Sequence, residues 1–106
     1  MTKGWAAHHT TGMPARHGGS DRVSTKIKLA TELRILGDVL TRVRERAGVK
    51  QSDLAARLGM PASYLSKIES GTRRLDVIEL VQIAEALGVN AGEIVRQVTE
   101  ALRNRT

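Results

Sequence analysis

The sequence predicts an all-α protein of five helices, because three properties of its 106 residues favour close-packed helices over a β-sandwich. Aromatic residues number only two, Trp5 and Tyr64, so the core must consist of Leu, Ile, Val and Ala. From Leu33 onward, apolar residues recur at three- and four-residue spacing, which is the period of an amphipathic helix. The length fits one domain rather than two.

The expected helices have recognisable starts and stops. Four of them end at a glycine, which adopts the left-handed backbone that closes a helix: Gly48, Gly59, Gly71 and Gly88. Thr31 can cap the first helix and Asp76 the fourth, because each has a side-chain oxygen. The second helix is expected to begin near Gln51 and the fifth near Ala91.

The first 30 residues predict a flexible basic arm, which precedes a domain at residues 31–106. Residues 1–22 hold glycines and all three histidines without a periodic apolar pattern, so they bury too little surface to offset the entropy of ordering. From Val23 to Leu29, apolar and polar residues alternate, which is the period of a strand. An early helical turn is the alternative for these residues.

Composition excludes several classes of function. The chain has no cysteine, which excludes disulfide scaffolds, thiolate zinc sites and cysteine nucleophiles. No apolar run approaches the roughly 18 residues of a membrane-spanning helix, so we expect a cytoplasmic, nucleoid-associated protein without a membrane partner. A formal net charge of +6 favours an acidic partner, most often nucleic acid or an anionic surface.

No enzymatic activity, cofactor or metal site is expected. The three histidines lie in the arm, where no fixed geometry holds them for a metal. Ser20, Asp21 and Ser24 can be drawn with a histidine as a hydrolytic triad, but no nucleophile elbow or rigid scaffold supports them.

The segment from Gln51 to Gly71 predicts two short helices joined by a three-residue turn. Ala55 is small where the two helices cross at a steep angle, and Gly59 allows the chain to turn with a positive φ. Such a rigid pair lets the third helix enter a major groove of DNA while the second crosses the sugar–phosphate backbone.

Residues spread over 36–94 match the pattern of one protein family. They are Arg44, Gly48, Gln51, Leu54, Ala55, Leu58, Gly59, Tyr64, Leu65, Ser66, Ile68, Glu69, Gly71, Ile83, Ala84, Ala86, Leu87 and Gly88. Together they are highly specific, although any one alone is weak. The chain thus resembles the phage-repressor and Cro-like helix-turn-helix proteins, also called the xenobiotic-response-element family. The resemblance implies a repressor-like DNA-binding domain that regulates transcription by binding specific DNA sequences.

The resemblance also implies a set of residues that contact double-stranded DNA. They are Gln51, Ser52, Pro61, Ala62, Ser63, Tyr64, Ser66, Lys67, Thr72, Arg73 and Arg74. Among them, Ala62, Ser63 and Lys67 match the base-facing positions of the recognition helix, which is the third helix. Lysine can donate to guanine O6 and N7, and alanine can pack on a thymine methyl group.

Other matched positions imply structural roles. Arg44 and Glu69 match a partly buried ion pair between the first and third helices, and Tyr64 matches a position that mostly packs. Pro61 departs from the family, which commonly has Ser or Thr there as a cap. Either Met60 is the cap and Pro61 the first helical residue, or the cap is missing.

Charge is unevenly distributed along the chain. Residues 42–74 hold eight basic and three acidic residues, whereas residues 75–106 hold three basic and five acidic ones. The positive half therefore coincides with the predicted DNA-binding motif, although a solvated charged loop is the alternative for Arg73 and Arg74. The basic arm is a second candidate to follow a groove or phosphates.

The fifth helix carries an apolar stripe with two interpretations. The stripe consists of Ile94, Val95, Val98 and Leu102. It either completes the core of one chain or forms the interface of a homodimer. We favour a homodimer that reads a palindrome, because one recognition helix touches few base pairs.

The sequence therefore predicts a sequence-specific regulator, more often a repressor. The alternative in another class is an antitoxin-type or adaptor module of the same fold, and a third is non-specific nucleoid or RNA binding. Because the chain holds one domain, we expect control through abundance, a regulatory protein partner or proteolysis.

Overall fold

The computed structural model describes residues 22–104, and within this part of the chain the fold is all-α, as predicted. The helices are α2 (Arg22–Arg46), α3 (Gln51–Leu58), α4 (Ala62–Glu69), α5 (Val77–Leu87) and α6 (Ala91–Asn104). No helix in the described residues is long and apolar enough to cross a membrane.

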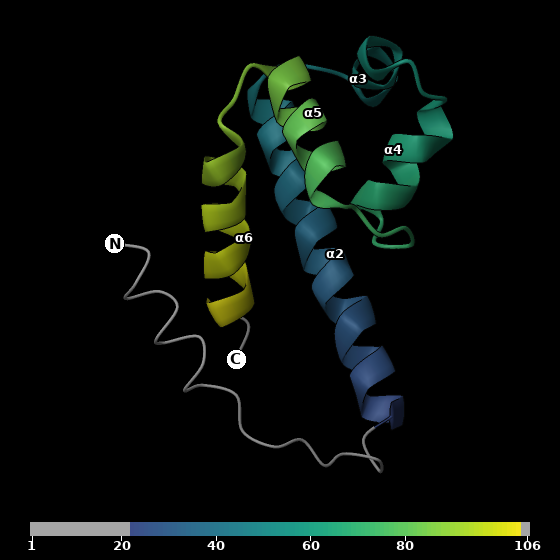
Figure 1. Cartoon of the computed structure of the whole chain (residues 1–106), viewed down its shortest axis with the longest axis vertical. Helices are drawn as coiled ribbons and strands as arrows, with labels where there is room; N and C mark the ends of the chain where they lie inside the picture. The colour runs from purple at the N-terminus through teal and green to yellow at the C-terminus, as the bar shows by residue number, and fades with distance from the viewer. Residues whose placement is uncertain (1–21, 105–106) are drawn as a thin grey trace.

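The other helices are arranged around α2, the longest one. In Figure 1, α6 lies along one side of α2, and α3 and α4 lie on the other side. Helix α2 contacts both α4 and α6, α3 contacts α4 and α5, and α5 contacts α6. The α3–α4 pair is therefore held against the rest of the domain by α2 and α5, whereas α6 lies across α2 from α4 (Figure 1).

The core consists of aliphatic side chains from all five described helices, as the scarcity of aromatic residues predicts. Its largest fully buried side chains are those of Val39, Leu54, Leu65, Ile68, Ile83 and Ile94. Tyr64 is the one aromatic residue among the buried side chains of the described region. Burying a large aliphatic side chain contributes about 1.5–3 kcal/mol, so this cluster is the main source of stability.

The start of the first helix differs from the prediction. Helix α2 begins at Arg22 and includes Thr31, whose hydroxyl donates to the carbonyl oxygen of Ile27 at 3.1 Å instead of capping a helix end. Residues 22–30 are therefore helical rather than part of an arm, and of the two alternatives for Val23 to Leu29 the helical one is correct. The remaining arm, residues 1–21, lies outside the described residues.

The predicted helix ends are largely confirmed. Gly48, Gly59 and Gly88 have positive φ values of 74°, 68° and 72°. Asp76 caps α5 in a capping box, in which its side chain accepts from the Glu79 backbone N–H and the Glu79 side chain accepts from the Asp76 N–H.

Two glycines allow α2 to approach α4 and the loop that follows it. A Cβ atom added at Gly37 would lie 2.3 Å from the carbonyl oxygen of Glu69, at the end of α4. A Cβ atom at Gly71, which has a φ of 81°, would lie 2.8 Å from the Cα of Arg34. Only glycine fits such contacts between backbones, so these two residues set the distance between α2 and the end of α4.

Candidate nucleic-acid interface

Helix α4 has one buried and one exposed face. Tyr64, Leu65, Ile68 and Glu69 are buried. The opposite face exposes Ala62, Ser63 and Lys67, the residues predicted to face bases, together with Ser66. This exposed face, which we call the α4 face, carries small polar groups and one cation, so it is suited to approach a DNA groove closely.

The turn between α3 and α4 is short and fixed by backbone hydrogen bonds. The Met60 N–H donates to the Ala55 carbonyl at 2.9 Å, directly after Gly59 turns the chain. Ala55 is only 2% exposed, as expected for a small residue between crossing helices. Pro61 occupies the N-cap position of α4 but makes no side-chain hydrogen bond there, so the side-chain cap of this helix is missing, which is the second of the two predicted alternatives.

An ion pair fixes α4 to α2 and α3. Arg44 Nε donates to Glu69 Oε2 at 2.7 Å, and Arg44 Nη2 donates to Glu69 Oε1 at 3.0 Å, so the predicted pair is present and bidentate. Arg44 Nη1 also donates to the carbonyl of Val49 at 2.8 Å. Gln51 Nε2 donates to Glu69 Oε1 at 2.7 Å, which gives this predicted DNA contact a buttressing role as well.

The surroundings of this pair determine its charge state. Burial raises the pKa of Glu69, but the hydrogen bonds from Arg44 and Gln51 together with the positive charge of Arg44 outweigh burial. The pKa of Glu69 therefore lies below its ordinary value, and the hydrogen bond to Glu69 raises the pKa of Arg44. Both groups are ionised at neutral pH. The bidentate pair fixes the orientation of α4 relative to α2.

The loop after α4 closes the recognition helix. Thr72 donates to the Lys67 carbonyl oxygen through its backbone N–H at 2.9 Å and through its hydroxyl at 3.1 Å. The Ser70 hydroxyl donates to the same oxygen at 3.1 Å. Thr72 thus terminates α4, and it is exposed beside the α4 face.

Arg73 is part of a cluster with Tyr64 and Glu79, which we call the Arg73 cluster. The guanidinium lies 4.7 Å from the centroid of the Tyr64 ring. Arg73 Nη2 donates to Glu79 Oε2 at 2.9 Å, and the Tyr64 hydroxyl donates to the same oxygen at 3.2 Å. The hydrogen bond from Arg73 and that from the Asp76 N–H lower the pKa of Glu79. The cluster joins α4 to the first turn of α5.

Glu79 is the residue of this region that the sequence analysis missed. Its carboxylate touches Tyr64, Arg73 and Asp76, although it lies on a helix that was not predicted to contribute to the DNA-binding surface. The signal for its position was the Asp76-x-x-Glu79 spacing of a capping box. That spacing gives no indication of the contact with Arg73, which depends on the tertiary structure.

The eleven predicted DNA contacts fall into three groups by exposure. The exposed residues are Ser52, Pro61, Ala62, Ser63, Ser66, Lys67, Thr72 and Arg74, the half-buried ones are Gln51 and Arg73, and Tyr64 is buried. Tyr64 therefore contributes mainly by packing and by supporting Arg73. Arg74 extends the exposed basic surface beyond the recognition helix.

The predicted dimer stripe on α6 requires a correction. Ile94 is 0% exposed and belongs to the core, so the prediction that it lies at an interface is wrong. Val98 packs against the same core, and Leu102 is half-buried. Val95, with 49% exposure, is the most exposed member of the stripe. Tertiary packing against α2 thus uses most of the stripe within one chain.

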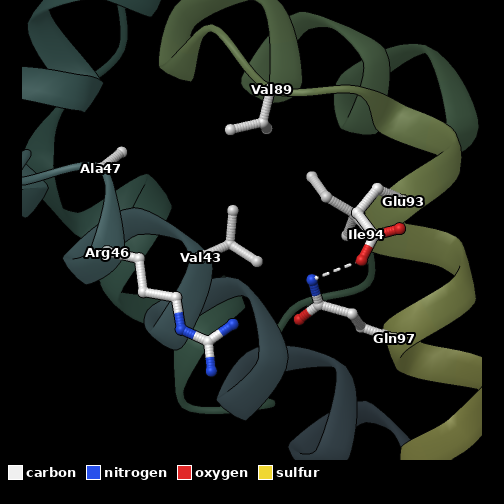
Figure 2. A pocket seen from close by; sticks show the side chains of 7 residues that line it. All are labelled: Val43, Arg46, Ala47, Val89, Glu93, Ile94 and Gln97. Atoms are coloured by element: carbon white, nitrogen blue, oxygen red, sulfur yellow. Dashed lines mark hydrogen bonds between the residues drawn. The ribbon is translucent and has the colours of Figure 1, made fainter.

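A shallow cavity of about 200 Å³ lies between α2 and α6. Figure 2 shows the side chains around it, which are Val43, Arg46, Ala47, Val89, Glu93, Ile94 and Gln97. Gln97 donates to Glu93 at 3.1 Å, and the hydrogen bonds from Arg96 and Gln97 lower the pKa of Glu93 to about 2. The cavity is on the α6 side of α2, whereas α4 lies on the other side, so it is not part of the DNA-binding surface. No group of metal-ligating side chains occurs in the described residues.

Comparisons with known proteins agree with this geometry. A family profile described as helix-turn-helix matches residues 40–94, more than half of the chain. The chain is 37% identical over 67 residues to an uncharacterized HTH-type transcriptional regulator of Sinorhizobium fredii, and the alignment covers 63% of this chain and 87% of that protein.

Solved structures show the same arrangement of helices. An XRE-family like protein from Pseudomonas syringae superimposes with a TM-score of 0.63 at 36% identity, covering 73% of this chain and 94% of that one. The restriction-modification controller protein C.AhdI from Aeromonas hydrophila superimposes with a TM-score of 0.57 at 28% identity, covering 60% and 97% of the two chains.

The matched region contains the whole helix pair, from the Arg44–Glu69 ion pair to the start of α6. Proteins of this kind are transcriptional regulators and not enzymes. The chain belongs to the phage-repressor and Cro-like helix-turn-helix family of DNA-binding transcriptional regulators.

Proposed function

We propose that this regulator is a repressor that binds a palindromic operator as a homodimer, with α4 in the major groove of each half-site. The observation that carries the proposal is the α4 face, which exposes Ser63, Ser66 and Lys67. The opposite side of the same helix is fixed by the Arg44–Glu69 pair. A rigid helix with a polar, exposed face is the arrangement that reads base edges in this class of protein.

Contacts to bases and to the backbone divide among the exposed residues. We assign Ala62, Ser63 and Lys67 to bases, because these residues lie on the α4 face. We assign Ser52 and Arg74 to phosphates, because they are exposed on the elements that flank α4. Base contacts determine specificity, whereas phosphate contacts determine orientation and salt dependence.

The proposed homodimer uses exposed apolar side chains of α5 and α6. Val77 and Ile78 are 71% and 66% exposed at the start of α5, and Val81 is 37% exposed one turn later. Val95 adds an exposed side chain on α6. Exposed apolar side chains grouped on one helix are typical of association surfaces. A second copy of the chain doubles the number of base pairs read, which specificity requires.

In vitro selection from random duplex DNA tests the proposal, followed by titration of the enriched site at several salt concentrations. We expect an inverted repeat with half-sites about one helical turn apart. Reporter expression from a promoter that overlaps this site should fall when the protein is present. Salt-dependent binding without an enriched sequence would instead indicate a non-specific binder, and an enriched single half-site would contradict the dimer.

A protein-interaction role of the antitoxin or adaptor type is the alternative. It predicts a stable complex with a partner protein and no enriched operator. Affinity purification of the full chain from its own cells, with and without nuclease, separates the two functions. A partner retained after nuclease treatment, together with failed selection, would replace the proposal.

A further inference from the structure

Arg73 uses only part of its hydrogen-bonding capacity within the chain. Its Nη1 donates to the Arg74 carbonyl at 2.8 Å and to Glu79 Oε1 at 3.3 Å, and its Nη2 donates to Glu79 Oε2 at 2.9 Å. A guanidinium has five N–H donors in one plane. The Nε–H and one N–H of Nη2 have no acceptor among the described residues. These two donors lie along one edge of the guanidinium, and such an edge matches two oxygens of a phosphate.

The guanidinium is held in place by three contacts. Glu79 pairs with its end, the Tyr64 ring lies against its face, and the Arg74 carbonyl accepts from its Nη1. Glu79 is itself fixed, because it accepts from the Asp76 N–H at 2.9 Å and from the Tyr64 hydroxyl at 3.2 Å. Arg73 has therefore lost much of its rotamer freedom before any ligand binds.

The Arg73 cluster lies beside the α4 face. Tyr64 is three residues before Lys67 on the same helix, so their side chains are neighbours on the helix surface. The Arg73 side chain lies over the Tyr64 ring and keeps 38% of its area exposed. A helix inserted in a major groove is bordered by the backbone phosphates, so this flank is where a phosphate is expected.

We propose that Glu79 is a positioning residue for DNA binding, because it holds Arg73 with its unpaired edge available to one backbone phosphate. The proposal depends on the proposed function in one respect, namely that the α4 face meets DNA. It also predicts that removal of this negative charge weakens DNA binding, which is the opposite of the usual effect. A carboxylate near DNA ordinarily weakens binding by charge repulsion, whereas Glu79 strengthens binding through Arg73.

The substitution Glu79→Gln tests this role. Glutamine also serves in a capping box, so the bond to the Asp76 N–H is retained while the charge that holds Arg73 is lost. We expect the Kd for the selected operator, measured by fluorescence anisotropy, to rise roughly 2- to 10-fold. Without Glu79 to hold it, the Arg73 side chain loses its rotamer entropy only when DNA binds, and this loss weakens binding. The melting temperature should stay close to that of the wild type.

Asp53→Asn is the matched control. Asp53 is exposed in the first turn of α3. Its replacement removes one negative charge next in sequence to Ser52, which is assigned to a phosphate, so we expect the Kd to stay equal or fall. If Glu79→Gln tightens binding as Asp53→Asn does, Glu79 only repels DNA and the proposal is wrong.

A double-mutant cycle establishes whether Glu79 acts through Arg73. In an Arg73→Ala background, Glu79→Gln should no longer weaken binding, because the side chain that Glu79 holds is gone. An equal loss in both backgrounds would overturn the proposal. If Glu79→Gln fails to fold, Arg73→Lys provides the second test, since it keeps the charge and the capping box but lacks the planar edge. Wild-type affinity of Arg73→Lys would also overturn it.

The wild-type titration separates this inference from the proposed function. If the wild type shows no operator binding, the proposed function fails. If the wild type binds and Glu79→Gln is unaffected, only the role of Glu79 is rejected.

Discussion

The residues of α4 divide between those proposed to contact DNA and those that hold the helix against the domain. Lys67 is exposed on the α4 face, whereas Glu69, two residues later, is buried and paired with Arg44. The two side chains point to opposite sides because successive helical residues are rotated by about 100°. Specificity and stability can therefore be tested by separate substitutions in one short helix.

Lys67→Ala should weaken binding to the selected operator by about 1–3 kcal/mol and leave binding to unrelated DNA nearly unchanged, because a lysine on a base edge discriminates among sequences. Arg74→Ala is the comparison, since a phosphate contact contributes equally to both kinds of DNA. Anisotropy titrations of each variant with operator and with random duplex measure the difference. Equal losses on both DNAs for Lys67→Ala would reject its assignment to a base.

Glu69→Ala should reduce the free energy of unfolding by about 3 kcal/mol, because it leaves the nearly buried Arg44 without its carboxylate partner. Glu93→Ala is the control. The Glu93 side chain is 46% exposed and pairs with Arg96 at 2.7 Å, and such solvent-screened surface pairs contribute little to stability. Urea unfolding of both variants provides the comparison. Similar losses of unfolding free energy in the two variants would mean that burial of the Arg44–Glu69 pair adds nothing to stability.

The same pair predicts how stability depends on pH. The pKa of Glu69 is lower in the folded protein than its ordinary value of 4.5, so its ionised form stabilises the fold above that pH. This stabilisation should be lost as the pH falls below about 4.5 through the folded pKa. The free-energy difference between wild type and Glu69→Ala, measured by urea unfolding from pH 7 to pH 3, should therefore shrink on acidification. A constant difference would show that Glu69 does not titrate in this range.

At the scale of elements, backbone contact between α2 and α4 sets the position of the recognition helix. Gly37 belongs to the part of α2 that precedes the matched family region at residues 40–94. Its missing side chain allows the carbonyl of Glu69 to approach. The part of α2 before residue 40 is thus more than an extension of the matched region, because this approach at Gly37 fixes the end of α4.

Gly37→Ala should destabilise the protein, even though alanine exceeds glycine in helix propensity by about 1 kcal/mol. The added Cβ would lie 2.3 Å from the backbone oxygen of Glu69, and backbone can move only if α2 and α4 separate. Gly92→Ala is the helical control, because its Cβ would meet only the Asn90 side-chain oxygen, at 2.9 Å. The melting temperature should fall for Gly37→Ala but not for Gly92→Ala. The operator affinity of Gly37→Ala should fall as well. A raised melting temperature for Gly37→Ala would exclude the close approach.

At the scale of the whole molecule, charge and apolar surface are distributed so that different elements can bind DNA and a second copy. The basic residues concentrate in residues 42–74, around the helix pair. Three exposed apolar side chains, Val77, Ile78 and Val81, lie in the first turns of α5, next to the loop that carries Arg73. A second copy of the chain that packs on α5 across a two-fold axis would therefore lie close to the DNA-binding surface.

Sedimentation velocity should show a dimer for the wild type and a shift toward monomer for Ile78→Asp, because a charge replaces a 66% exposed apolar side chain at the proposed interface. Val95→Asp tests the contribution of α6 in the same way. Operator affinity should fall with the dimer, while binding to a single half-site should be retained. A dimer that survives both substitutions would place the interface elsewhere.

Most of the helices, and the family, could be predicted from the residues alone. Helical periodicity and the terminal glycines predicted the helices from α3 to α6, and the family resemblance implied the Arg44–Glu69 pair, which joins α2 to α4. These features are local or belong to a specific pattern, so they can be read along the chain. The start of α2 at Arg22 was missed, because the alternation from Val23 to Leu29 is compatible with two periods.

Which faces remain exposed, and which side chains meet, depends on how the helices pack in three dimensions. Packing on α2 placed Ile94 of the expected interface stripe in the core and left the start of α5 exposed. It also brought Glu79 to Arg73, and Gly37 to the end of α4. An apolar stripe in the sequence indicates only that this face of the helix will be buried. Whether the same chain or another one covers it depends on how helices distant in sequence pack together.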